Sequence, residues 1–378
     1  MIRSTLLLCA VLLAVACSAC APVPVSSPPP PPGGYLAAAT CGIGGQPFLQ
    51  KVQFLPSGYD ASRGYYSPLP AGANPTPIDP NSKYAAALQN AFVLAPPAFQ
   101  NRLCELTGIY VNGPDPCTTD CFRNGSWGYR ASDGSTYVAI TAGLWNLRCP
   151  DGSLPYAYHC FETDLLNQTI GWPPHPPVPL PQYISANQDA DTFDMTILAA
   201  LAHEVGHVRW YEVLNPDVVN NWGGWYDPNT FCGGSFFSPW YGGVHRPPTW
   251  RYFAARRQGN GLGDIHRRDP QIDTIDRAKG INSSILTYLD QLYQPIQAWT
   301  SFVGAATPDE DFVETFKLWV LTNAQSHPLR SLSINFGYGV RDIPQDYGIP
   351  DPMKDGAPSA TNKPLLATKA QCIGHYVI

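Results

Sequence analysis

Residues 196–213 read TILAALAHEVGHVRWYEV, an apolar helical pattern with two histidines and a glutamate in its middle. His203 and His207 are four residues apart, which places both rings on one side of an α-helix, one above the other. Two imidazoles in this arrangement can bind one Zn²⁺ ion. Glu204 is rotated by about 100° from His203, so it leans across the metal and can act as a base toward water.

The rest of this helix is typical of a buried element. The apolar side chains on the far side from the histidines are Ile197, Leu201, Val205 and Val208. The small residues on the flanks, which would let other elements approach, are Ala199, Ala200, Ala202 and Gly206. Asp191 or Thr192 can cap the start of the helix, and Asn215–Pro216 ends it.

A catalytic zinc ion needs a third protein ligand and an open position for water. A metzincin would supply a glycine and a histidine where this chain has Trp210 and Val213. Asp227 stands where a thermolysin-like enzyme would have its ligand, but Pro228 follows it and is hostile to a helix. The stretch PDEDFVETF, residues 308–316, is the better candidate for a second ligand-bearing helix.

Glu310 and Glu314 lie four residues apart on that second helix, so they share one face. The aromatic side chains on its other face are Phe312, Phe316 and Trp319. One glutamate would bind the zinc ion, and the other would orient a ligand histidine through its free ring N–H. In an alternative interpretation, Glu310 bonds back to Thr307 in a capping box and Glu314 becomes the ligand.

HEVGH followed far downstream by EDFVETF resembles the gluzincin metallopeptidases, and most closely the anthrax lethal factor-like peptidase domain. The resemblance covers two helices and implies a zincin-like α+β fold with a small mixed sheet. It also implies that Glu310 is the third zinc ligand and that Glu314 orients a ligand histidine. An extended substrate would lie along an edge strand, for which residues 137–142 are the candidate.

The chain departs from these relatives in two ways. The interval from His207 to Glu310 is longer than theirs, so residues of about 220–280 would be an insertion. A tyrosine expected as oxyanion donor before the ligand glutamate is absent, and Val303 is near its place. The candidate side chains to replace it are Tyr293, His245, His266 and His327.

The first residues predict export. MIRSTLLLCAVLLAVACSAC has one arginine, a short apolar run and small residues, as in a cleaved signal peptide. LAVAC resembles a bacterial lipobox with Cys17 as the lipidated residue, which predicts an outer-membrane lipoprotein in the cell envelope. Cleavage near Cys20 would instead give a periplasmic or secreted protein. Residues 21–40 predict a proline-rich tether.

Eight cysteines follow the signal, an even number that predicts up to four disulfides in an exported chain: 41, 104, 117, 121, 149, 160, 232 and 372. The short spacings Cys117–Cys121 and Cys149–Cys160 favour local pairing. A cysteine-ligated zinc site is the competing interpretation, and the closely spaced pairs that such sites use are absent.

Three further patterns complete the prediction of one domain over residues 41–378, an α+β fold with long disulfide-tied loops. Residues 82–111 predict two helices broken at Pro96–Pro97, and residues 160–172 predict a short helix. Residues 135–145 alternate and predict a strand. The chain after residue 326 carries no clear pattern down to Cys372.

The sequence therefore predicts a zinc endopeptidase that holds one Zn²⁺ per chain, cleaves peptides or proteins and is tied to a membrane by a lipid anchor. The net charge of −6 and the lack of a basic run argue against a nucleic-acid partner. Two alternatives remain: a zinc-binding or structural lipoprotein without catalysis, and an amidase acting on cell-wall peptides.

Overall fold

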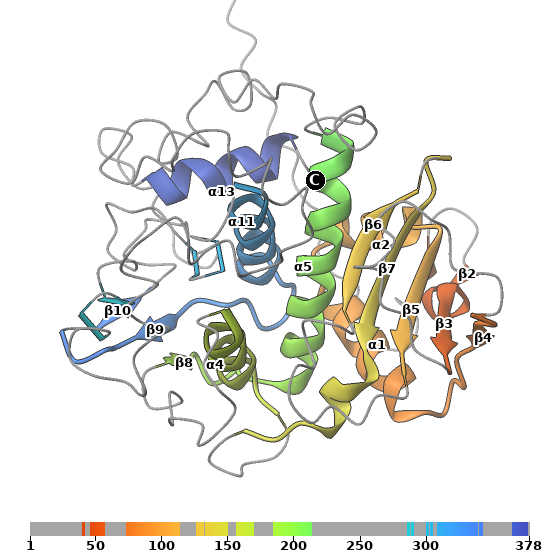
Figure 1. The fold of residues 1–378 in the computed structure, drawn as a ribbon, viewed down its shortest axis with the longest axis horizontal. Coiled ribbons are helices and arrows are strands. Elements are labelled where there is room, and N and C mark those ends of the chain that lie inside the picture. The colour runs from red at the N-terminus through yellow and green to blue at the C-terminus, as the bar shows by residue number, and fades with distance from the viewer. Residues whose placement is uncertain are drawn as a thin grey trace, which may run out of the picture. The chain divides into compact units, whose positions relative to one another are not determined.

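A computed structural model gives the fold of the chain (Figure 1). The structure describes residues 40–41, 46–56, 73–113, 126–131, 133–149, 156–169, 184–213, 286–287, 289–290, 300–301, 303–304, 308–338, 340–342 and 365–376. All of them belong to one compact unit, Leu36–Ile378. The predicted signal peptide with Cys17, the tether and the insertion at about 220–280 lie outside the described residues.

The described chain mixes helices and strands along its whole length. The strands are β1 Thr40–Cys41, β2 Gln46–Pro47, β3 Val52–Leu55, β4 Thr76–Pro77, β5 Gly108–Asn112, β6 Trp127–Arg130, β7 Thr136–Thr141, β8 Ile184–Ala186, β9 Leu332–Ile334 and β10 Arg341–Asp342. The helices are α1 Lys83–Leu94, α2 Pro97–Glu105, α4 Tyr158–Thr169, α5 Phe193–Val213, α11 Pro308–Thr322 and α13 Leu365–Tyr376, with short 3₁₀ helices η1 Phe48–Lys51 and η3 Ala142–Asn146.

Five strands form a small mixed sheet in the order β4-β3-β5-β7-β6. Strands β3, β5 and β7 are parallel, and the outer strands β4 and β6 run antiparallel to them. The crossover from β3 to β5 runs through α1 and α2, which is how parallel neighbours are connected. A separate antiparallel sheet has the order β10-β9-β8.

The two faces of the five-stranded sheet carry different side chains because strand residues alternate. Ile109 and Val138 join the main core with α1 and α5, whereas Tyr110 and Ala139 belong to a smaller cluster with the aromatic rings of β6. The sheet therefore packs one face against helices, and α5 lies on that face.

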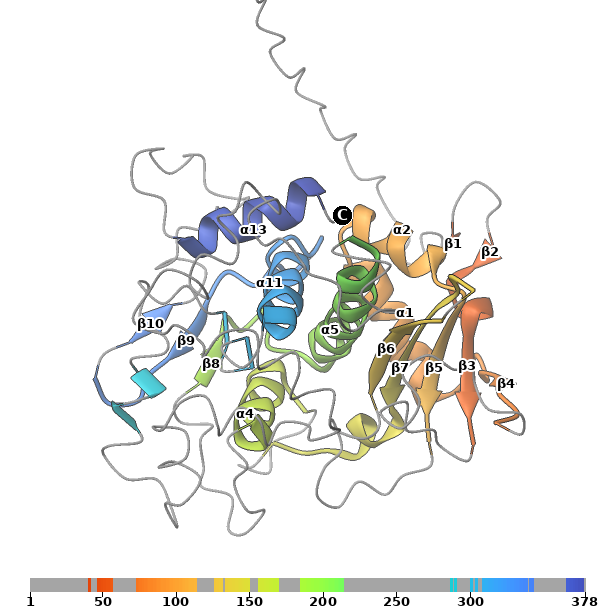
Figure 2. The same cartoon turned by 45° about the horizontal axis from the view of Figure 1, so that its top comes forward.

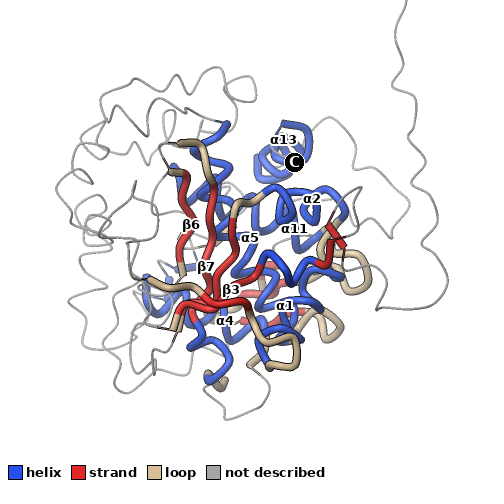
Figure 3. Tube along the Cα trace, turned by 90° about the vertical axis from the view of Figure 1, so that its right-hand side faces the viewer, coloured by secondary structure: helices blue, strands red, loops and turns tan. Residues whose placement is uncertain are grey.

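Helix α5 runs through the middle of the fold (Figures 1 and 2). It packs against β6 and β7 on one side and against α11 on the other, and it also contacts α1 and α4. In Figure 3 the strands β3, β6 and β7 lie in front of α5 and α11. Thr192 caps the helix, because its hydroxyl accepts a hydrogen bond of 3.2 Å from the amide of Met195.

The predicted α+β class with a small mixed sheet is confirmed, and so are disulfide bonds. The structure contains Cys41–Cys104 and Cys149–Cys160, the second of which is a predicted local pair. Cys372 is also disulfide-bonded. Cys117 and Cys121 lie outside the described residues.

Three predictions from the sequence are wrong in detail. Residues 108–112 form strand β5 rather than the end of a helix, because this five-residue segment is buried between two neighbouring strands. Strand β7 is paired on both sides and cannot be the substrate edge, whereas β6 ends the described sheet. Helix α13 forms in the segment expected to be irregular, because Lys369 and Ile373 gain buried positions there.

Among the helices that the structure describes, none has the length and apolar character needed to cross a membrane.

Candidate metal centre

Helices α5 and α11 are in contact at Gly206 of α5, which has no side chain. A Cβ atom at Gly206 would lie 3.2 Å from both Cα and Cγ1 of Val313, tighter than ordinary van der Waals contact. A larger residue at Gly206 would push the two helices apart. The glycine therefore allows α11 to approach α5 closely enough for its carboxylates to reach the histidines.

The carboxylate of Glu310 lies between the two imidazoles of α5. Its Oε2 atom is 3.8 Å from Nε2 of His203, and its Oε1 atom is 3.8 Å from Nε2 of His207. The two rings have centroids 5.0 Å apart and planes at 80°. One ligand atom from each of the three residues lies within 4.8 Å of the other two. Two helices far apart in sequence thus bring three side chains of ligand-forming types together.

This donor set fits a zinc ion. Tetrahedral zinc with ligands at about 2.0–2.2 Å separates neighbouring ligand atoms by about 3.4 Å, so the distances of 3.8 Å need to close by only a few tenths of an ångström. Two imidazoles and one carboxylate are the ligands of many catalytic zinc sites. The three side chains keep 14% to 16% of their surface exposed, so part of each remains in contact with solvent.

The pKa values of Glu204 and His203 are both raised in this centre. Burial raises the pKa of Glu204 to about 8, and Glu310 adds to the rise while His203 opposes it. Burial lowers the pKa of His203, but its hydrogen bond with Glu314 and the charges of Glu204 and Glu310 raise it to about 9. A buried group of acids that retains protons so strongly is one that a divalent cation would stabilise.

A buried carboxylate fixes the ring of His203 from behind. Nδ1 of His203 is 2.7 Å from Oε1 of Glu314, which accepts a hydrogen bond from the ring. The other oxygen of Glu314 accepts a hydrogen bond from the hydroxyl of Ser301 and pairs with the ammonium of Lys317 at 2.8 Å. Because Nδ1 is engaged with Glu314, Nε2 is the nitrogen that faces Glu310 and His207.

The ammonium of Lys317 also reaches Glu162 of α4, with 2.7 Å between Nζ and Oε1. Burial raises the pKa of Glu314, but Lys317 and His203 outweigh it and hold this pKa well below its usual range. Burial lowers the pKa of Lys317, yet Glu162 and Glu314 raise it to about 12. Glu314 and Lys317 are therefore both charged at neutral pH.

Strand β6 approaches α5 beside the candidate base. A Cβ atom at Gly128 would lie only 2.0 Å from the backbone oxygen of Glu204, so no other residue fits there. Gly128 faces the helix while its neighbours Trp127 and Tyr129 are buried on the other face of the sheet. The last described strand of the sheet is thus held against the helical turn that carries Glu204.

The structure brings together only some of the predicted site residues. His203, Glu204, His207, Glu310 and Glu314 meet as described above. His327 does not join them, because it follows the C-terminal end of α11 at Thr322. Glu310 is in the first turn of α11, about 18 Å from that end along the helix.

The remaining candidate oxyanion donors, Tyr293, His245 and His266, lie outside the described residues. So do Asp227 and Thr307, the alternative ligand and the possible capping residue.

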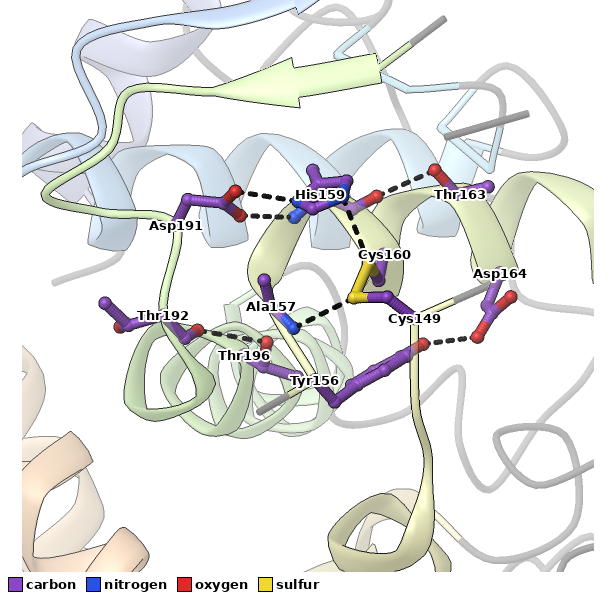
Figure 4. The surroundings of a disulfide bond; sticks show 10 residues. All are labelled: Cys149, Tyr156, Ala157, His159, Cys160, Thr163, Asp164, Asp191, Thr192 and Thr196. Carbon is purple, nitrogen blue, oxygen red and sulfur yellow. Dashed lines mark hydrogen bonds and ion pairs between the residues drawn. A yellow bond between two sulfur atoms is a disulfide. The ribbon is translucent and has the colours of Figure 1, made fainter. Parts of the chain in front are cut away.

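A second cluster of potential ligands lies around α4 (Figure 4). Sulfur atoms of Cys149 and Cys160 and a ring nitrogen of His159 are close enough for a metal ion, but the two sulfurs are joined in a disulfide. Nδ1 of His159 is 2.7 Å from the carboxylate of Asp191, and its Nε2 is 3.1 Å from the sulfur of Cys160.

Sequence reasoning missed Lys317, Glu162 and Ser301. The only available signal was the three-residue spacing of Glu314 and Lys317, which places them on one helix face. Glu162 comes from a distant helix, and nothing local in the sequence connects it to α11.

Comparisons of the chain with protein-family models, with curated proteins and with solved structures give no match in any of the three.

Proposed function

We propose that this protein is a zinc-dependent endopeptidase of the gluzincin type, with a zincin-like fold. The single observation that carries the proposal is the convergence of His203, His207 and Glu310 from two helices, with the carboxyl of Glu204 on the next position of α5. These are the ligand and base types that metal-assisted hydrolysis needs.

In this proposal His203, His207 and Glu310 hold one zinc ion. When bound, the ion supplies Lewis-acid activation of a water molecule and of the scissile carbonyl group. Glu204 accepts the proton of the attacking water and delivers it to the departing amine. In the ion-free protein burial raises the pKa of Glu204 to about 8, and a bound divalent cation would lower it, which favours the ionised form that accepts a proton.

The edge of the sheet supports a peptide as substrate. Strand β6 ends the described sheet and is held against the turn of Glu204 through Gly128. An extended peptide that pairs with such an edge would pass close to the base. We therefore propose β6, in place of β7, as the strand along which the substrate lies.

We further propose that the enzyme is exported to the bacterial cell envelope and anchored by lipid on Cys17. The signal-like run and lipobox-like LAVAC support this location. The segment falls outside the described residues, so the proposal rests on its sequence pattern.

The decisive experiment compares wild type with Glu204→Gln in a digest of a peptide library, with the zinc content of both proteins measured. We expect one zinc per chain in each, and cleavage that is roughly 10² to 10⁴ times slower in the variant. Equal cleavage by both proteins would reject Glu204 as the base. Bound zinc without cleavage by wild type would favour a binding lipoprotein, and release of peptide only from cell wall would favour an amidase.

A further inference from the structure

The side of α11 that faces α4 carries a buried chain of charges behind the candidate metal centre. Lys317 has a side chain that is only 4% exposed, and its ammonium sits between Glu314 at 2.8 Å and Glu162 at 2.7 Å. The side chain of Glu314 is fully buried and that of Glu162 is 7% exposed. Two carboxylates and one ammonium are therefore withdrawn from water together, an arrangement that is costly unless each charge has a partner.

Geometry links this charge chain directly to a proposed ligand. Oε1 of Glu314 is occupied by Nδ1 of His203 at 2.7 Å, while Oε2 is occupied by Lys317 and Ser301. With both oxygens engaged on opposite sides, the carboxylate cannot rotate without breaking a contact. The ring of His203 is therefore held by a carboxylate that is itself held by Lys317.

Lys317 is in turn fixed from α4. Glu162 binds its ammonium, and the ring of Phe161 lies 5.8 Å from the same nitrogen. Both contacts come from one helix, so the position of α4 determines where the ammonium stands. The chain runs from α4 through α11 to α5.

We propose that Lys317 and Glu162 are positioning residues of the metal centre, which hold Glu314 so that it orients His203 toward the ion. This inference rests on the proposed zinc site and adds two residues that do not touch the ion. Groups that hold a ligand histidine contribute to metal affinity, and their loss weakens binding by roughly tenfold to a hundredfold.

Helix α11 offers a matched control. Lys369 of α13 binds the carboxylate of Asp311 at 2.6 Å and 2.8 Å, and both side chains of this pair are fully buried. The pair also joins α11 to another helix. This ion pair joins α11 to α13, whereas the Glu162–Lys317 pair joins α11 to α4 and reaches His203 through Glu314.

The test replaces each ion pair with apolar side chains, which in the first variant leaves the buried carboxylate of Glu314 with His203 and Ser301 as its partners. The first variant is Glu162→Met with Lys317→Met, and the control is Asp311→Leu with Lys369→Met. Zinc affinity is measured by competition with a chelator, and the absorption spectrum of the cobalt-substituted protein reports the ligand geometry. Thermal unfolding of each protein gives the loss of stability.

We expect the first variant to bind zinc roughly tenfold to a hundredfold more weakly than wild type and to shift the cobalt spectrum. The control should keep both properties while losing comparable stability. Equal zinc affinities in the two variants would overturn the proposal, because the Glu162–Lys317 pair would then be structural only.

A single change, Glu162→Gln, covers the case in which the first variant does not fold. It preserves the shape of the side chain and leaves Lys317 paired with Glu314, so we expect a smaller loss of zinc affinity in the same direction. Unchanged affinity in Glu162→Gln would remove Glu162 from the proposal. Wild-type protein that binds no zinc would instead defeat the metal centre itself, which separates the two failures.

Discussion

Two histidines in this protein each have a carboxylate beside the ring, but the other potential ligands near them differ. His203 and His159 each place Nδ1 2.7 Å from a carboxylate, that of Glu314 and that of Asp191. Each also has two other potential ligands within reach, in the groups His203–His207–Glu310 and Cys149–His159–Cys160. The support of the ring is thus the same in both clusters.

The difference lies in the remaining ligands. Around His203 they are an imidazole and a carboxylate whose atoms stand 3.8 Å apart, close to the separation of neighbouring ligand atoms on one zinc ion. Around His159 they are two sulfurs already joined to each other, which leaves no thiolate to bind a metal. A group of ligand-type residues is therefore a candidate metal site only when its donor atoms can converge on one ion.

The first prediction compares the effects of the two histidines on zinc binding. His203→Ala removes one of the three proposed ligands and should weaken zinc binding by roughly a hundredfold to a thousandfold. His159→Ala should leave zinc affinity unchanged, because its cluster is closed by the disulfide. Metal analysis after dialysis against a weak chelator measures both, and a loss of zinc in the His159 variant would contradict the comparison.

The second prediction concerns stability rather than metal. Replacing Cys149 and Cys160 together by serine opens a loop of 11 residues and should cost about 3 kcal/mol of unfolding free energy. Zinc content should remain at one per chain. Chemical denaturation with parallel metal analysis gives both quantities, and a variant that loses zinc while folded would show that the two clusters are coupled.

The third prediction compares the two carboxylates that hold the rings. Glu314→Gln should weaken zinc binding by roughly tenfold to a hundredfold, because the amide is a poorer acceptor for the ring N–H of His203. Asp191→Asn makes the same chemical change at His159 and should leave zinc affinity as in wild type. Competition titrations with a chelator test the pair, and equal losses would mean that orientation of His203 is not the cause.

The fourth prediction concerns the dependence of zinc binding on pH. Burial lowers the pKa of His203, but Glu314, Glu204 and Glu310 raise it from 6.5 to about 9, so below pH 9 zinc must displace a proton from this ring. The apparent Kd should weaken by about tenfold for each pH unit below 9. Calorimetry in buffers of different ionisation enthalpy measures the released proton, and a Kd that is constant from pH 7 to 9 would contradict this assignment.

Protein treated with a chelator gives the matching stability test. A folded-state pKa above the unfolded value contributes stability that is complete below about pH 6.5 and lost as the pH rises through about 9. The melting temperature of chelated protein should therefore fall across this range. The pH profile of the Asp191→Asn variant, treated in the same way, should run parallel to that of wild type.

Local spacing made much of the centre predictable. Positions four apart on a helix share a face whatever the rest of the chain does, so His203 with His207 and Glu310 with Glu314 could be paired from sequence. The helices themselves follow from apolar periodicity and from the cap at Thr192. The sheet edge was misassigned, since strand order depends on partners far away in the chain.

Two features could be predicted from the sequence. Helical geometry repeats every 3.6 residues, so the ligand-type residues could be assigned to two helices, and an even number of cysteines in an exported chain predicted disulfides. Three features depend on the folded structure: which glutamate lies between the histidines, which strand ends the described sheet beside Glu204, and the position of Lys317 and Glu162 behind His203. These are contacts between distant segments. They are set by how closely α4, α5, α11 and β6 can pack, which no local pattern encodes.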